Sequence, residues 1–232
     1  MNVLLLRLTG PMQSWGTQSR FTIRDTGLEP SKSGVIGLIC AALGRPRSDS
    51  VEDLSALRMG VRVDYQGHIA SDYHTTLNVI KASGASAKAG EAVVSTRYYL
   101  ADADFLIGLE SDNLPLLERI DAGLANPHWP LCLGRKAFPP GEPVRLIGGM
   151  HKNQSLRNTL LTYPRHQRKG DIDVKTVRLV LEDPDGESVR IDQPVSPFSE
   201  RGFAPRHVMT ELIPIEEIPV CKEELCICPS CG

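Results

Sequence analysis

Two short segments near the start of the chain have residue types that could hold an anion. Residues 10–16 begin and end in glycine, and residues 30–38 (PSKSGVIGL) lead into an apolar stretch. Glycine lets main-chain N–H groups approach a ligand closely, and a helix N-terminus adds unpaired donors and a positive dipole end. Phosphate is therefore the expected ligand, beside an exposed aromatic residue, Trp15. The chain has none of the motifs of P-loop nucleotide hydrolases, zinc-helix metalloproteases or serine hydrolases.

Positive and negative charges are unevenly distributed along the chain, although the formal net charge is only −2. Residues 131–180 contain ten Lys or Arg and three acidic residues, whereas residues 181–232 contain four and eleven. The basic stretch has the charge needed to hold a polyanion backbone, and the acidic stretch could face a basic protein surface. A solvated charged surface is the alternative for either stretch. The basic residues concerned are Arg135, Lys136, Arg157, Arg165, Arg168 and Lys169.

The C-terminal tail has a spacing of cysteines that predicts a metal site. Cys221, Cys226, Cys228 and Cys231 lie within eleven residues, and the last two belong to a sequence, CPSCG, with the form of a zinc knuckle. Four thiolates would complete a tetrahedral, structural zinc site. The short separation between the pairs is unusual, so an intermolecular site, a redox-active pair and a disordered tail are alternatives. No other cofactor is expected.

Length and composition predict a folded protein that is neither secreted nor embedded in a membrane. The chain has 232 residues, of which 41% are hydrophobic and 23% charged, enough to bury one large core or two smaller ones. The apolar run at residues 3–6 is too short for a signal peptide or a membrane span. The six cysteines do not form the pattern of a disulfide scaffold, so a reducing, cytoplasmic location is expected.

The periodicity of apolar residues predicts alternating strands and helices in residues 1–150. A helix is expected at residues 33–44, with Ser33 as its N-cap and Gly44 as its stop, and another at residues 114–124. Strands are expected at residues 3–8, 59–65, 105–109 and 143–147. The resulting order, β-α-β-β-α-β, is that of an α+β, ferredoxin-like domain, which also underlies many RNA-binding modules.

A long insertion separates the second and third of these strands. Residues 73–80 and 93–100 have strand-like patterns, and the small residues between them predict a β-hairpin with a flexible tip. Lys81, Lys88 and Arg97 give this hairpin positive charge, so we expect it to order on a partner. The alternative is a surface insertion with no role.

Residues 151–232 are expected to form a smaller, β-rich region that ends in the cysteine-rich tail. Residues 174–181 and 187–191 have strand-like patterns, and the turn-forming sequence DPDG between them predicts that they pair as a second hairpin. A further strand is expected at residues 206–213. A domain division is therefore predicted near residue 150.

Five sequence blocks, taken together and in order, resemble a known family. They are residues 10–16, 30–38, 72–75, 97–105 and 133–136, and they span most of residues 1–140. In this combination the chain resembles the type I-E members of the Cas-five family of CRISPR-associated RAMP proteins, which act in antiviral defence. The resemblance implies a ferredoxin-like domain with a protruding β-hairpin thumb at residues 73–100. It also implies a noncatalytic subunit of the Cascade surveillance complex that caps the 5′ handle of crRNA and docks on the backbone and large subunits.

Under this resemblance, charged side chains and main-chain donors would hold the phosphates of the RNA. Lys32, Ser33 and Gly34, at the start of the first helix, are candidates for that contact. Arg135 and Lys136 are candidates for the same role, because they lie in a loop flanked by glycine and proline.

Aromatic side chains would stack on unpaired bases. Trp15 and Tyr98 are the candidates. Trp15 could equally be buried as an anchor of its loop, and Tyr98 could equally face the core. The complete set of RNA-binding candidates is Gln13, Trp15, Lys32, Ser33, Gly34, His74, Lys81, Lys88, Arg97, Tyr98, Arg135 and Lys136.

A metal-independent endoribonuclease that processes CRISPR repeat RNA is the main alternative function. Such cleavage needs one group to deprotonate a 2′-hydroxyl and another to protonate the leaving oxygen. His74, Tyr73 and Lys136 are available for these steps, and type I-C relatives process the precursor themselves. Because the blocks resemble type I-E members, which leave cleavage to a separate endoribonuclease, binding without catalysis is the preferred prediction. A zinc-dependent protein-interaction module is a more distant third.

Overall fold

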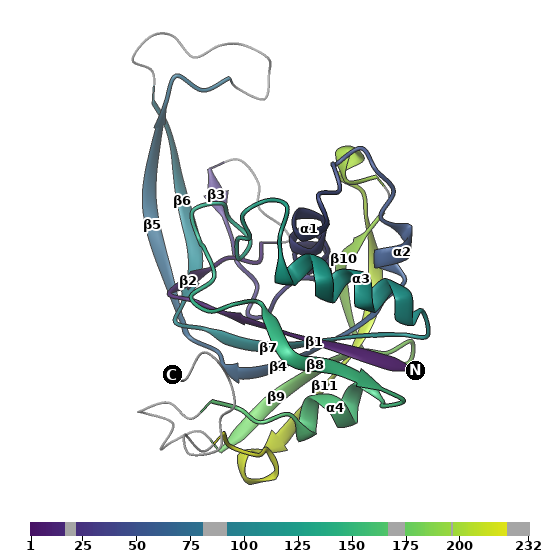
Figure 1. Ribbon diagram of the computed structural model, residues 1–232. Helices are drawn as coiled ribbons and strands as arrows, with labels where there is room; N and C mark the ends of the chain where they lie inside the picture. The colour runs from purple at the N-terminus through teal and green to yellow at the C-terminus, as the bar shows by residue number, and fades with distance from the viewer. Residues whose placement is uncertain (17–21, 81–91, 167–174, 196, 222–232) are drawn as a thin grey trace.

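The computed structural model describes residues 1–16, 22–80, 92–166, 175–195 and 197–221. Its main feature is a sheet of seven strands: β1 (Asn2–Thr9), β4 (Arg58–Tyr65), β7 (Asp104–Ser111), β8 (Arg145–Lys152), β9 (Thr176–Glu182), β10 (Ser188–Pro194) and β11 (Phe203–Pro214). The strands lie in the order β10-β11-β9-β4-β7-β1-β8, and every neighbouring pair is antiparallel (Figure 1).

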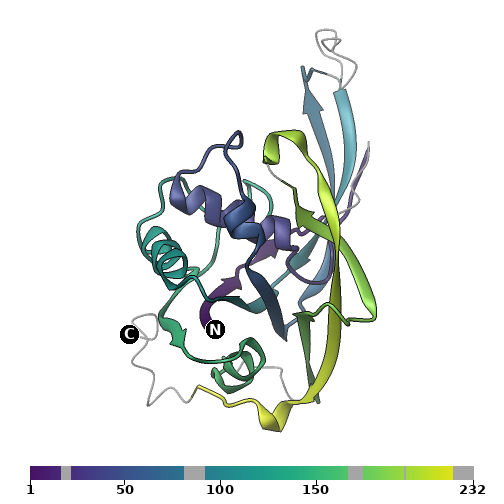
Figure 2. The same ribbon diagram turned by 90° about the vertical axis from the view of Figure 1, so that its right-hand side faces the viewer.

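Helices cover both faces of this sheet, which gives the chain a mixed α+β fold. α1 (Lys32–Leu43) and α3 (Leu114–Ala125) lie on one face, and α4 (Leu156–Thr162) lies on the other (Figures 1 and 2). Because both faces are covered, β4 is buried at all six interior positions rather than at alternate ones. Short helical turns, α2 (Glu52–Ser55), η2 (Phe198–Glu200) and η3 (Ile215–Glu217), lie in the connections. None of the described helices is long and apolar enough to cross a lipid bilayer.

The predicted elements of residues 1–150 are confirmed with adjusted ends. The N-cap of α1 is Ser31, whose Oγ accepts a hydrogen bond from the N–H of Gly34 at 3.3 Å, so the prediction of Ser33 as N-cap was wrong. Gly44 ends the helix in the left-handed conformation, as predicted. Asn113 caps α3 by accepting a hydrogen bond from the N–H of Leu116. β8 begins two residues later and ends five residues later than the predicted strand.

The strands after residue 150 continue the same sheet in an order that the sequence did not predict. β9 and β10 do not pair as a hairpin, because β11 lies between them and pairs with both. β11 has twelve residues, and it pairs with β10 through its first half and with β9 through its second half. The turn-forming sequence therefore connects two strands that are not adjacent in the sheet. β9 pairs in turn with β4, and the division of the chain near residue 150 stays a prediction.

A two-stranded hairpin projects from the sheet between β4 and β7 (Figure 1). Its strands are β5 (His68–Leu77) and β6 (Ala92–Ala101), and their pairing was predicted from the sequence. Two short strands, β2 (Met12–Gln13) and β3 (Ile23–Arg24), pair with β6 near its base. The predicted tip, with Lys81 and Lys88, lies outside the described residues.

Buried charges hold the strands at the base of this hairpin. Arg7 on β1 contacts Asp104 at 3.0 Å and Asp64 at 3.6 Å, and all three side chains are at most 3% exposed. Arg62 contacts Asp64 at 2.5 Å and donates to the main-chain carbonyl of Tyr163, beyond α4, at 2.6 Å. Burial acts to lower the pKa of Arg7, but the carboxylates of Asp104 and Asp64 outweigh it and raise this pKa. The network therefore ties β1, β4, β7 and the end of α4 together.

Replacing Asp104 with Asn should lower the free energy of unfolding by about 3–5 kcal/mol, because buried Arg7 would lose a carboxylate. Urea denaturation of the purified protein measures this difference. Asp112→Asn is the matched control, since its 77% exposed carboxylate pairs with the N-terminal amino group and should contribute less than about 1 kcal/mol. Equal losses in the two variants would contradict a structural role for the buried network.

Candidate nucleic-acid interface

Three arginines from separate segments meet at the base of the hairpin. Arg24 on β3 is paired in register with Arg97 on β6, and Arg135, in the loop after α3, donates to the main-chain carbonyl of Arg24 at 3.3 Å. We call Arg24, Arg97 and Arg135 the arginine cluster. Burial, and then the charges of Arg97 and Arg24, lower the pKa of Arg135 below its usual value. The guanidinium groups of Arg24 and Arg97 are thus both close enough to act on that of Arg135.

Little negative charge offsets the cluster. Among the described residues, no carboxylate forms an ion pair with any of its three guanidinium groups. Asp25 and Asp72 lie near enough to act on Arg135 in the opposite direction, but after burial and the two arginines. The Nε of Arg97 donates to the hydroxyl of Ser95 at 3.1 Å. The cluster therefore keeps an excess of positive charge that an anion could neutralise.

Arg135 lies at the start of a tight turn. The N–H of Phe138 donates to the carbonyl of Arg135 at 2.9 Å, and the guanidinium carbon lies 5.7 Å from the centre of the Phe138 ring. Gly134 has φ of 87°, and a Cβ placed there would lie 1.7 Å from the carbonyl oxygen of Ser14. The loop therefore packs directly on the segment that contains Ser14, which only glycine allows at this position.

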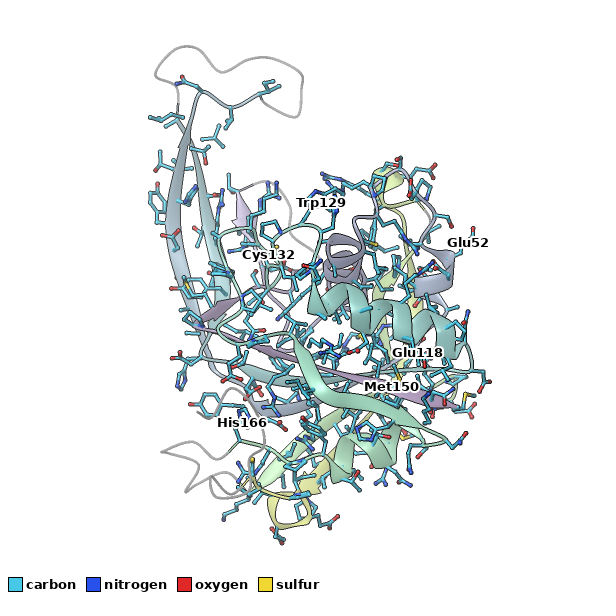
Figure 3. The ribbon with its side chains drawn as sticks, viewed as in Figure 1. Glu52, Glu118, Trp129, Cys132, Met150 and His166 are labelled. Atoms are coloured by element: carbon cyan, nitrogen blue, oxygen red, sulfur yellow. The ribbon has the colours of Figure 1, made fainter. Side chains whose placement is uncertain are left out.

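Lys136 and Cys132 extend this loop. Lys136 is exposed, and its contact with RNA stays a prediction. Burial raises the pKa of the Cys132 thiol, and the charge of Lys136 acts in the opposite direction. In Figure 3, Cys132 lies between the hairpin and the helices.

The two faces of the hairpin differ in chemistry. Residues directly opposite in an antiparallel pair share a face, so Arg97 shares one with its register partner Asp72 and with His74. Tyr73 and Tyr98 lie on the other face as diagonal neighbours, with exposed fractions of 72% and 38%. Of the alternatives for Tyr98, the exposed position is the one observed.

Two of the residues named for the nuclease alternative, Tyr73 and His74, do not converge. Tyr73 and His74 are consecutive in β5, so their side chains point to opposite faces of the hairpin. The Nδ1 of His74 lies 3.6 Å from a carboxylate oxygen of Asp72, and the His74 side chain is 41% exposed. Lys136 lies close enough to Cys132 to lower the pKa of its thiol, against the effect of burial.

The predicted phosphate site at the start of α1 is occupied by the protein itself. Lys32 is 1% exposed, its Nζ lies 2.9 Å from the carboxylate of Glu182, and its N–H donates to Asp192 at 2.8 Å. Burial lowers the pKa of Lys32, with Glu182 acting to raise it. The prediction that Lys32 contacts phosphate is therefore corrected, because two carboxylates from the C-terminal strands already take its donors. Ser33, now within the helix, is half-buried.

The tryptophan of the first segment is a buried anchor rather than an exposed aromatic. Trp15 is 1% exposed, and its Nε1 donates to Gln13 Oε1 at 3.1 Å. The Nε2 of Gln13 donates to the carbonyls of Leu8 and Ala103, so neither side chain is available to RNA in this structure. Gly34 serves this packing, because a Cβ there would lie 2.9 Å from the Trp15 ring.

Four of the ten basic residues at 131–180 pair with acids from elsewhere in the chain. The ion pairs are Arg145–Asp121, Lys152–Glu118, Arg157–Glu211 and Arg178–Glu29. Arg165 is buried, while Arg168 and Lys169 lie outside the described residues. The cluster instead combines Arg135 with Arg24 and Arg97, and no local signal in the sequence singles out Arg24.

The cysteine-rich tail is described only at its first member. The N–H of Cys221 donates to the carbonyl of Arg165 at 2.9 Å. Cys226, Cys228 and Cys231 lie outside the described residues, so the zinc site stays a prediction.

Comparison with known proteins identifies the family. The family model described as "CRISPR-associated protein (Cas_Cas5)" matches residues 3–209. The chain belongs to the Cas5 family. A curated relative, "CRISPR system Cascade subunit CasD" of Escherichia coli (strain K12), is 31% identical over 176 residues, which cover 69% of this chain and 76% of the relative.

Two solved structures resemble this Cas5 chain along nearly its whole length. One, described as "Crystal structure of Cas protein", is 43% identical with a TM-score of 0.77, and the match covers 94% of this chain and 98% of the other. The second, from a "CRISPR RNA-guided surveillance complex", is 33% identical with a TM-score of 0.74, and the match covers 93% and 92%. The mixed α+β fold is therefore shared with solved Cas structures.

Gly134→Ala should destabilise the protein by at least about 2 kcal/mol, because left-handed strain adds to a clash with the Ser14 carbonyl. Gly148→Ala is the matched control: Gly148 has φ of 72°, but its Cβ would meet nothing within 4 Å. Left-handed strain alone should cost that variant roughly 1 kcal/mol. Denaturant titrations of both variants measure the difference, and equal losses would show that the loop does not pack on Ser14.

Proposed function

We propose that this chain is a subunit of a type I-E Cascade surveillance complex that binds the 5′ handle of crRNA at the arginine cluster without cutting it. The observation that carries the proposal is the set of three adjacent guanidinium groups, none of which has a carboxylate partner among the described residues. The similarity to a Cascade subunit and to a chain of an RNA-guided surveillance complex supports this role.

The chemistry of the cluster suits RNA phosphate. Like charges held together repel one another, and a phosphate between them would turn that repulsion into attraction. Arginine presents a planar fork of N–H donors that matches phosphate oxygens. Tyr73 and Tyr98 offer exposed rings on the other face of the hairpin, where unpaired bases could stack.

We also propose that the fold has the finer form that the family resemblance implies. The strands β8, β1, β7 and β4 lie side by side in that order, with α1 and α3 on one face, which is consistent with a ferredoxin-like domain. The hairpin of β5 and β6 would be its thumb, placed by the buried network to reach RNA held at the cluster.

Replacing Arg24, Arg97 or Arg135 singly with Ala should weaken binding of a single-stranded RNA that carries the handle sequence. Each lost phosphate contact should reduce the slope of log K against log salt by about 0.7. Fluorescence anisotropy at several salt concentrations measures both effects. Arg157→Ala on α4 is the control, because it removes the same charge from the opposite face of the sheet.

Two results would overturn the proposal. If the slope of log K against log salt is the same in the cluster variants as in Arg157→Ala, the cluster does not bind RNA. Shortened RNA after incubation with the wild-type chain, and intact RNA with His74→Ala, would assign the alternative endoribonuclease function.

The four tail cysteines are proposed to hold one structural zinc ion through Cys221, Cys226, Cys228 and Cys231. Elemental analysis of the purified full chain should then find one zinc per chain. The double variant Cys228→Ser and Cys231→Ser should lose it, because two thiolates do not complete a tetrahedral site. A metal-free wild-type chain, purified without chelators, would contradict the zinc site.

A further inference from the structure

An apolar strip remains uncovered on the α4 face of the sheet. On β9, Leu179 and Leu181 face α4 and are buried in its core. The register of β11 against β9, and of β10 against β11, carries this face outward to Met209, Val189 and Ile191. These three side chains are 40%, 49% and 62% exposed. We call Val189, Ile191 and Met209 the β10–β11 strip.

No described helix or strand covers the strip, but the connection from β9 to β10 crosses β11 at Val208, where the Gly186 carbonyl lies 3.0 Å from the Nδ1 of His207. α4 packs against β1, β4 and β7, and β10 is the outermost strand of the sheet. In Figure 2, β10 and the start of β11 lie away from α4. On the opposite face, the residues of β11 that lie beside β10, Arg206 and Val208, are at most 8% exposed. An apolar surface on an outer strand is typical of a contact with another protein.

Acidic side chains border the strip. Asp185 and Glu187 lie in the turn that leads into β10. Both are exposed, and among the described residues neither of them has an ion-pair partner. Arg190, in the same strand, is paired with Glu29. This border repels RNA and also repels a second copy of the same surface.

We infer that the β10–β11 strip docks a neighbouring protein subunit whose contact surface is apolar and ringed by Lys and Arg. The inference rests on the proposed function as a Cascade subunit and adds the surface that joins the chain to a protein partner. The arginine cluster and the strip then bind different partners, because the charges around them differ in sign. RNA is held at the basic base of the hairpin, and protein is held at the acidic outer strands.

The test uses the tagged full chain co-expressed with its own CRISPR RNA and with the other subunits encoded at the same locus. Ile191→Lys should lower recovery of one identified subunit by about tenfold, because it removes an apolar contact and adds repulsion. Glu187→Lys should lower recovery of that same subunit. Leu212→Lys is the matched control, since Leu212 is a 67% exposed apolar residue of β11 on the opposite face and should leave recovery unchanged.

Binding of the handle RNA by the purified variants separates this inference from the proposed function. Unchanged RNA binding in Ile191→Lys, together with the loss of one subunit, supports the inference and shows that the variant is folded. Full recovery of every subunit with Ile191→Lys overturns the strip as a docking site and leaves the proposed function intact. Self-association of the wild-type chain that Ile191→Lys abolishes would overturn the inferred partner. Recovery of neither RNA nor subunits by the wild-type chain would overturn the proposed function itself.

Discussion

The hairpin that carries part of the arginine cluster stands on a buried set of ion pairs. Arg7 on β1 joins Asp64, near the end of β4, to Asp104, at the start of β7, so one guanidinium holds both strands where the hairpin leaves the sheet. Charges buried this deeply are tolerated only when each has partners of good geometry. Arg62 supplies the second partner of Asp64 and bonds to the carbonyl of Tyr163. The end of α4 thus supports the base of the hairpin, although α4 lies on the face of the sheet opposite α1 and α3.

The arginine cluster depends on this anchorage. The register of β6 against β3 sets Arg97 beside Arg24, and the packing of Gly134 on Ser14 brings Arg135 to the same place. Four basic residues of the stretch at 131–180 are paired with acids in the fold, whereas the cluster draws one residue from each of three distant segments. The positive potential at the hairpin base is therefore a property of the folded chain rather than of any basic stretch.

The start of α1 binds negative charge, as its sequence predicts, but the anions are carboxylates of the chain rather than phosphate. A helix N-terminus attracts negative charge, and phosphate was the expected ligand. The carboxylate of Asp192 takes the N–H of Lys32 from a position 160 residues away, and Glu182 takes the ammonium group. The same attraction that would hold a ligand thus fastens α1 to the C-terminal strands.

The sequence by itself determined the elements whose signals are local. Apolar periodicity predicted β1, β7, α1, α3 and the pairing of β5 with β6. The spacing of apolar residues along a short segment indicates which side of a helix or strand is buried. Tertiary structure alone decided that β11 separates β9 from β10, that Lys32 and Trp15 are buried, and that Arg24 joins the cluster. Each of these outcomes depends on contacts between residues far apart in the chain, whose free energy appears only once the sheet has assembled.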